Sequence, residues 1–151
     1  MRWRYKTGIE YVISALNTDV LLEIGMAEEC IRRADSVAQP HSRLRRQIAA
    51  CAAAALSNAA TLAAEVLSLG GDPPAAGPRP RGSAYGAASI EECLVQAQSL
   101  LAHYQKRLAM AERLGLLRLR EVFRDIIESK RAHVLHAAVM AAAGSHPRQL
   151  S

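Results

Sequence analysis

The sequence predicts an all-α protein that folds as a four-helix bundle with one long crossover between the second and third helices. Along four segments, apolar residues recur in steps of four and three, as on the buried face of a helix. Half of the residues are apolar but only 4% are aromatic, which disfavours β-sandwiches and barrels because they rely on aromatic and β-branched residues. A length of 151 residues fits a single domain covering 1–151.

The first two helices are expected at about 5–38 and 42–69, and each ends where helix breakers begin. Pro40 stops the first helix, and Gly70 and Gly71 stop the second. The first apolar stripe consists of Ile9, Ile13, Leu16, Val20, Ile24, Ala27 and Ile31. The second consists of Ile48, Ala52, Ala55, Ala59, Leu62, Val66 and Leu69.

The last two helices are expected at about 89–114 and 116–143. Ser89 with Glu92 three residues later forms a capping box at the start of the third helix. Gly115 marks the corner, Gly144 closes the fourth helix, and a short tail fills 144–151. The third stripe consists of Ile90, Leu94, Ala97, Leu101, Tyr104, Leu108 and Ala111. The fourth consists of Leu119, Phe123, Ile126, Lys130, His133, Ala137 and Met140.

The lengths of the connections predict the topology. Short connections make the first and second helices antiparallel neighbours, and likewise the third and fourth. The crossover loop at 70–88 is rich in Gly, Pro, Ser and Arg. At about 3.3 Å per residue this loop can run the full length of a bundle, which indicates one long crossover, because a simple up-down-up-down bundle would not need so long a loop.

Charge and cysteine usage bound the partners and the compartment. A net charge of +5 and a pI near 9.5 permit an anionic partner without requiring one. Cys30, Cys51 and Cys93 form no CxxC pair and are typical of reduced, buried thiols in a cytoplasmic protein. No secretory segment is evident, and the Ala-rich stretch 48–69 carries Asn58 and Glu65. This stretch indicates a buried helix of a soluble protein, so no membrane partner is expected.

Three short motifs are similar to those of bacterioferritins, which belong to the ferritin-like superfamily. The segment 58–73 ends in Leu-Gly-Gly-Asp-Pro, as the second bacterioferritin helix ends in Leu-Gly-Gly-x-Pro. Ile9-Glu10-Tyr11 followed by Asp19 resembles the first helix, and Ile126-Ile127-Glu128 followed by His133 resembles the fourth. The resemblance covers about 8–143 and implies a ferritin-like bundle with a di-iron ferroxidase site. Such a site takes a Glu from each of two helices and a Glu-x-x-His from each of the other two.

The residues at the corresponding positions do not form that site. The resemblance places Asp19 at the first-helix Glu, Ala55 and Asn58 at the second-helix Glu and His, and Leu101 at the third-helix Glu. At the fourth-helix Glu and His it places Lys130 and His133. Iron requires carboxylate and imidazole ligands, and 42–64 contains no Asp, Glu or His. We therefore expect no metal ligands, no catalytic residues and no cofactor-binding residues. Leu56 lies where the haem-ligating Met would be, so no haem is expected either.

Several alternatives remain open for the polar residues near these positions. Lys130 either extends its ammonium to solvent or forms a buried ion pair with Asp19, hydrogen-bonded to Asn58 or His133. Glu23 is expected in solvent. His133 is expected to be a core histidine, the alternative being a surface metal site with His136 or Glu128.

Two further motifs point weakly to other functions. His103 and Lys106 have the spacing of a histidine-phosphotransfer motif, but Arg107 stands where such motifs have Gly, and His103 is expected at the surface. Groups of basic residues could together contact DNA, although no recognition motif accompanies them. These residues are Arg2, Arg4, Lys6, Arg43, Arg45, Arg46, Arg79, Arg81, Arg118, Arg120, Arg124 and Arg131.

The sequence therefore predicts a degenerate, non-catalytic ferritin-like protein that acts as an assembly or interaction module. We expect a homo-oligomer, a dimer or larger, and one version of this prediction is an inert subunit mixed with a ferritin-like paralogue. The first alternative is iron storage or ferroxidase activity with relocated ligands, in which case iron is the cofactor. The second alternative is a basic helical bundle that binds nucleic acid.

Overall fold

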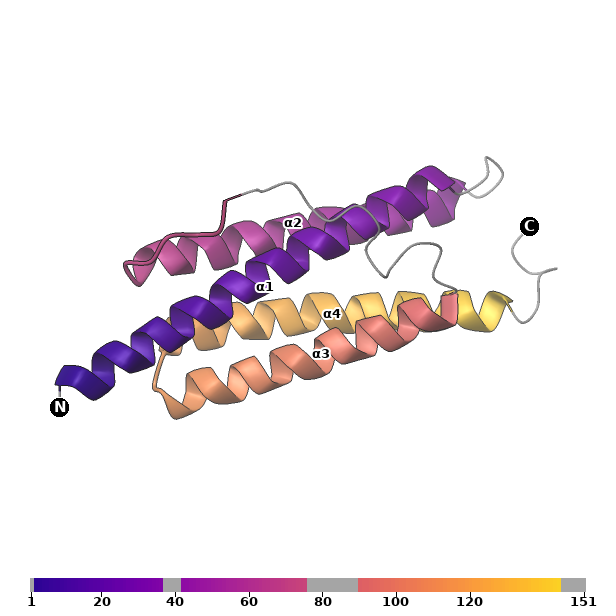
Figure 1. The fold of residues 1–151 in the computed structure, drawn as a ribbon. Helices are drawn as coiled ribbons and strands as arrows, with labels where there is room; N and C mark the ends of the chain where they lie inside the picture. The colour runs from indigo at the N-terminus through magenta and orange to yellow at the C-terminus, as the bar shows by residue number, and fades with distance from the viewer. Residues whose placement is uncertain (1, 37–41, 76–89, 145–151) are drawn as a thin grey trace. The chain divides into compact units, whose positions relative to one another are not determined.

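The computed structural model describes residues 2–36, 42–75 and 90–144, which form four helices and no strand. The helices are α1 (Arg2–Ser36), α2 (Ser42–Ser68), α3 (Ile90–Arg113) and α4 (Leu117–Gly144) (Figure 1). The predicted all-α class is confirmed, and each helix lies close to its expected range. Pro40, the Ser89 cap, residues 76–88 of the crossover and the tail at 145–151 lie outside the described residues.

The chain divides into two compact units. The first combines residues 1–36 and 45–83, and the second combines 37–44 and 84–151. The first unit therefore contains α1 with nearly all of α2, and the second contains α3 and α4.

The first unit is an antiparallel hairpin whose register is fixed at both ends. At one end, the Asn17 side chain donates a hydrogen bond to the Asp72 carbonyl at 3.0 Å. At the other end, small buried side chains of the two helices pack into one cluster. Its members are Ala27, Cys30, Ala52 and Ala55. Between these two anchors, the middle of α1 faces the second half of α2.

Two glycines with different structural roles cap the C-terminal end of α2. Gly70 has φ +82° and donates its N–H to Leu67 at 3.0 Å, while Gly71 donates to Val66 at 2.9 Å. This is the Schellman pattern, in which glycine takes the left-handed position. Gly71 is needed for close packing, because a Cβ there would lie 2.6 Å from Cγ2 of Ile13.

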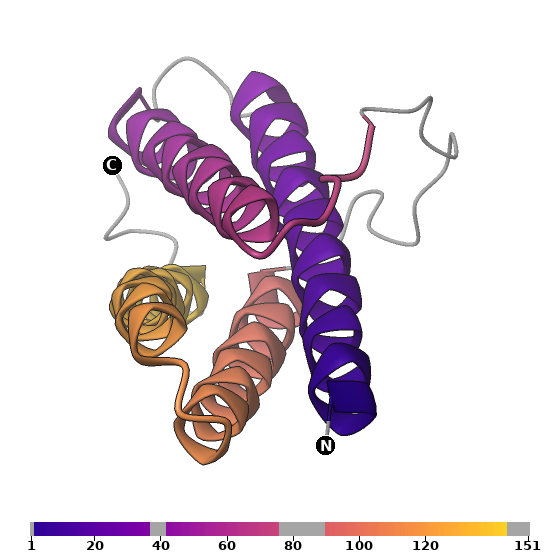
Figure 2. The same cartoon turned by 90° about the vertical axis from the view of Figure 1, so that its left-hand side faces the viewer.

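The second unit is a hairpin with a tight corner at Gly115, as predicted (Figure 2). Gly115 has φ +67° and donates to Glu112 at 3.2 Å, while Leu116 donates to Ala111 at 2.9 Å. The corner therefore repeats the Schellman pattern. Between the helices, the rings of Tyr104 and Phe123 lie 6.2 Å apart, and both are fully buried.

The buried stripes of α2 and α4 follow the predicted positions, but that of α1 differs. The prediction placed Ile31 in the core, and the structure leaves it 46% exposed. Leu16, Val20 and Ala27 of the predicted stripe are buried. A continuous buried line along α1 consists of Val12, Leu16, Asp19, Glu23, Ala27, Cys30 and Ala34. These residues follow one another in steps of three and four, so helix geometry places two acids in the core line while Ile31 falls outside it.

Candidate functional site

Two carboxylates of α1 are buried on the same face of the helix. Asp19 and Glu23 are four residues apart, which makes them neighbours along a helix, and their exposed fractions are 0% and 1%. The prediction that Glu23 lies in solvent is therefore wrong. Burying a carboxylate costs free energy unless it is paired or hydrogen-bonded. These two acids therefore form a polar region inside the first unit.

Glu29 of α1 is also buried and is paired with Arg32 and Arg33. A fourth buried carboxylate, not predicted from the sequence, is Glu65 of α2. It is 4% exposed and belongs to the stretch of α2 that faces the middle of α1, where Asp19 lies. Its position three residues after Leu62 is the signal that could have found it, since residues three apart share a helix face. Asn58 is half-buried, and its Nδ2 atom has no hydrogen-bond partner in the structure.

Apart from Glu65, the buried residues of α2 offer only hydrocarbon to the interior. They are Ala52, Ala55, Ala59, Leu62 and Val66. Ala55, which the resemblance places at a Glu ligand, is 1% exposed and packs against Ala27 and Cys30 of α1. A methyl group cannot coordinate iron, so α2 contributes no ligand at this position.

The second unit buries a cation at its aromatic centre. Lys130 is only 2% exposed, and its Nζ lies 5.9 Å from the centroid of the Tyr104 ring, within range of a cation–π interaction. The alternative in which Lys130 reaches solvent does not agree with this burial. Leu101 and His133 are both half-buried.

The side chains at the expected di-iron positions do not fit two iron ions. A di-iron site needs four carboxylates and two imidazoles, whereas the residues that the resemblance assigns to three of the carboxylate positions are Ala55, Leu101 and Lys130. An ammonium also repels a metal cation, and Lys130 is buried. Within residues 2–36, 42–75 and 90–144, no three His, Cys, Asp or Glu side chains form a group that could hold a metal ion.

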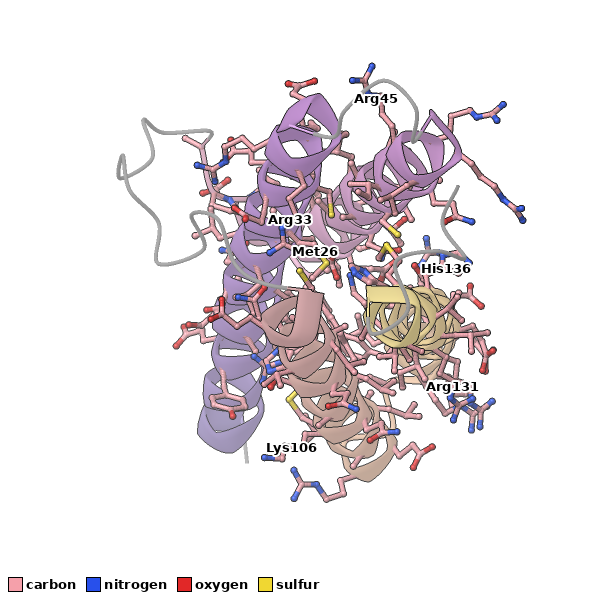
Figure 3. All side chains as sticks on the ribbon, turned by 90° about the vertical axis from the view of Figure 1, so that its right-hand side faces the viewer. Met26, Arg33, Arg45, Lys106, Arg131 and His136 are labelled. Atoms are coloured by element: carbon pink, nitrogen blue, oxygen red, sulfur yellow. The ribbon has the colours of Figure 1, made fainter. Side chains whose placement is uncertain are left out.

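The histidines and lysine of the weaker sequence motifs differ in their exposure to solvent. His103 is half-buried, and its ring meets the Tyr104 ring edge-on with centroids 5.2 Å apart. It was expected at the surface and is only partly exposed. Lys106, the other residue of that motif, is exposed and extends away from the helices (Figure 3). His136 is also exposed, and the Glu128 carboxylate accepts a hydrogen bond from Arg131.

Several of the basic residues are neutralised or have a structural role. On α4, Arg124 lies 3.2 Å from Glu121 and Arg131 is paired with Glu128. Arg45 donates to the Ala34 carbonyl at 3.1 Å, near the end of α1. The side chains of Arg2, Arg4, Lys6, Arg79 and Arg81 lie outside the described residues. Arg43, Arg46 and Arg118 are exposed, so nucleic-acid binding stays a prediction that these contacts do not test.

The outward face of α2 carries no charge over more than five turns. Its exposed residues are Ala49, Ala50, Ala53, Leu56, Ser57, Ala60, Thr61, Ala64, Leu67 and Ser68. By length and composition, residues 43–68 could also cross a membrane, and 33% of the most apolar window is buried. That indication is weak, because core helices of soluble proteins pass the same test.

Comparison with known proteins agrees on the fold. No protein-family model and no curated protein matches the sequence. Among solved structures, the chain is similar to the bacterioferritin of Desulfovibrio desulfuricans, a protein with a di-iron site. The TM-score is 0.80 at 18% identity, over 91% of this chain and 81% of that one.

A second similar structure is a ferritin-like, diiron-carboxylate protein from Bacillus anthracis. Its TM-score is 0.75 at 19% identity, over 88% of this chain and 96% of that one. The chain therefore has the ferritin-like four-helix fold, which confirms the predicted fold class and the predicted resemblance in fold.

Proposed function

We propose that this protein is a ferritin-like chain without a working ferroxidase centre, and that it serves as an assembly module. The observation that carries the proposal is the inward face of α2. From Ala52 to Leu62 its buried side chains are hydrocarbon, and the half-buried Asn58 adds only an amide. This stretch therefore offers neither the carboxylate nor the imidazole of the Glu-x-x-His that a di-iron site takes from this helix.

Lys130 supports the same proposal. This lysine is 2% exposed, and the family resemblance assigns it to the position of a carboxylate ligand, where it would replace a negative charge with a positive one. The buried charged residues of such a core would have a structural role, because buried charges are tolerated where they are paired.

The direct test is the iron content of the purified protein before and after anaerobic loading with Fe(II), followed by exposure to air. We expect only trace iron. A matched variant restores the family's ligands through Ala55→Glu, Asn58→His, Leu101→Glu and Lys130→Glu. Iron uptake by this variant alone would locate the loss of function in those positions. Uptake of about two irons per chain by the natural protein would refute the proposal.

For the assembly, we propose that the uncharged outer face of α2 packs against a second copy of the chain. Interface cores are depleted of charge, and two such faces meet without desolvating a charged side chain. Leu67 on this face and Leu135 on α4 are each 62% exposed and form a matched pair. In sedimentation experiments, Leu67→Glu should dissociate the oligomer while Leu135→Glu leaves it intact. The opposite pattern, or a monomeric natural protein, would contradict this interface.

The buried carboxylates keep one alternative open, namely iron oxidation or storage with relocated ligands. Asp19, Glu23 and Glu65 are all buried in the first unit, and hard cations prefer carboxylate oxygens, so a metal would have to draw these acids together, since they do not form a metal-binding group in the described structure. If the loading experiment finds iron, Glu65→Gln separates the cases. Loss of iron in this variant would assign the metal to these acids, whereas unchanged iron would place it elsewhere.

A further inference from the structure

The corner between α3 and α4 exposes two large apolar side chains that the hairpin does not bury. Leu117 is 65% exposed and Leu114 is 49% exposed, and only Gly115 and Leu116 separate them in the chain. Leu119, two residues further along α4, is by contrast 3% exposed. Gly115 reverses the chain with a φ of +67°, so Leu114 and Leu117 both lie at the tip of the second unit (Figure 2).

Arginines flank these two leucines on both sides. Arg113 ends α3 and Arg118 belongs to the first turn of α4, and both are exposed. The acids nearest in the sequence are Glu112, which is exposed, and Glu121, which accepts a hydrogen bond from Arg124 at 3.2 Å. The tip therefore combines exposed hydrocarbon with an excess of positive charge. We call this set the corner patch, and it consists of Arg113, Leu114, Leu117 and Arg118.

An anionic membrane surface is the partner that fits both features of the corner patch. At such a surface, apolar side chains enter the boundary between the headgroups and the acyl chains, and basic side chains are attracted to the anionic headgroups. A second copy of the patch fits less well, because a two-fold contact brings the same residues of both chains together and would set arginine against arginine. The uncharged outer face of α2 offers these arginines no acid either.

We propose that the corner patch binds the surface of an anionic membrane, with Leu114 and Leu117 inserted between the headgroups and Arg113 and Arg118 against the lipid phosphates. The contact is peripheral and differs from a membrane-spanning helix, which the sequence analysis did not expect. It goes beyond the proposed assembly and does not depend on it, because the patch belongs to α3 and α4 and the proposed interface lies on α2.

The test is co-sedimentation of the purified protein with vesicles of phosphatidylcholine, either alone or mixed with an equal amount of phosphatidylserine. We expect binding to the anionic vesicles that falls with rising salt, since salt screens exposed charges. Leu117→Ser should weaken this binding by about tenfold, the effect of withdrawing a leucine side chain from an apolar phase, and Arg113→Gln by about fivefold. Leu135→Ser is the matched control and should bind normally, since Leu135 is 62% exposed on the same helix but outside the corner patch.

A fluorescent reporter measures insertion of the tip without relying on a loss of binding. The natural chain has one tryptophan, Trp3, and is the blank for Leu117→Trp, whose additional emission should shift to the blue when anionic vesicles are added. An unshifted emission would overturn the proposal.

Three results of the vesicle experiment would also overturn it: no binding to the anionic vesicles, equal binding to the neutral ones, or equal losses in Leu135→Ser and Leu117→Ser. A smaller oligomer in Leu117→Ser with unchanged vesicle binding would overturn it as well and would assign the corner patch to a second copy. Leu67→Glu separates this proposal from the assembly proposal, because that variant should still bind the anionic vesicles when it no longer forms the oligomer.

Discussion

Replacing the buried Lys130 tests whether a carboxylate in the core depends on its charge. Lys130→Met keeps the length and apolar character of the side chain and removes only the ammonium. If a buried carboxylate is paired with Lys130, the variant leaves that acid uncompensated and should lose about 3–5 kcal/mol of unfolding free energy. Without such a pair, replacing a buried charge by an apolar side chain is expected to be neutral or stabilising.

The contact with Tyr104 determines how large the loss of unfolding free energy must be before it indicates an ion pair. A cation–π interaction contributes about 0.5–2 kcal/mol, so a loss clearly above that range cannot come from the ring alone. The difference between the effect of Tyr104→Leu in the natural protein and its effect in the Lys130→Met background measures this share, because the ring has no cation left to attract in the second case. Urea unfolding followed by circular dichroism gives each free energy, and unchanged slopes would confirm that only stability has changed.

A double-mutant cycle then identifies the acid. If Asp19 is the partner, which is one of the alternatives left open by the sequence, then Asp19→Asn should be much less harmful in the Lys130→Met background than alone. The coupling should fall within about 0.5–3 kcal/mol. Parallel cycles with Glu23→Gln and Glu65→Gln are the controls, since both acids are also buried. A loss below about 1 kcal/mol for Lys130→Met would refute a buried ion pair altogether.

Three other changes have outcomes fixed by local packing, each measured by urea unfolding. Gly71→Ala should destabilise by about 1–3 kcal/mol, since its Cβ would meet Ile13 at 2.6 Å; no change would contradict this tight contact. Gly25→Ala, in mid-helix with nothing within 4 Å, should instead stabilise by about 0.5–1 kcal/mol, and a loss would mean that α1 is not a regular helix there. Phe123→Ala should cost about 3–5 kcal/mol, and a much smaller loss would show that Phe123 is not central to the second unit.

Helix positions and turns were predictable because their signals are local. Gly115 and Gly70 both take a positive φ, the conformation for which glycine has no steric penalty. The stripe of α2 was also predictable, since it consists of alanine and aliphatic residues in regular steps. Such features depend on neighbours within one or two turns, which a single sequence contains.

The buried acids were harder to predict because hydropathy assigns them to the surface. Glu23 and Glu65 lie in the buried lines of their helices, and only the spacing to Leu16 and Leu62 hints at it. Ile31 shows the reverse error, since this apolar residue was predicted to be buried and lies outside the buried line of α1. Which face of α1 turns inward depends on the close contact of Ala27 with Ala52 and Ala55, and that is a tertiary property.

The two tight hairpins have a consequence for the order of folding. Only residues 114–116 separate α3 from α4, and only 37–41 separate α1 from α2. The entropy of closing a loop rises with its length, and contacts that are local in sequence form fast. Each hairpin should therefore form as a cooperative unit of its own, before the segment from 69 to 89 is closed. Pulsed hydrogen exchange during refolding should accordingly protect the amides of each hairpin together.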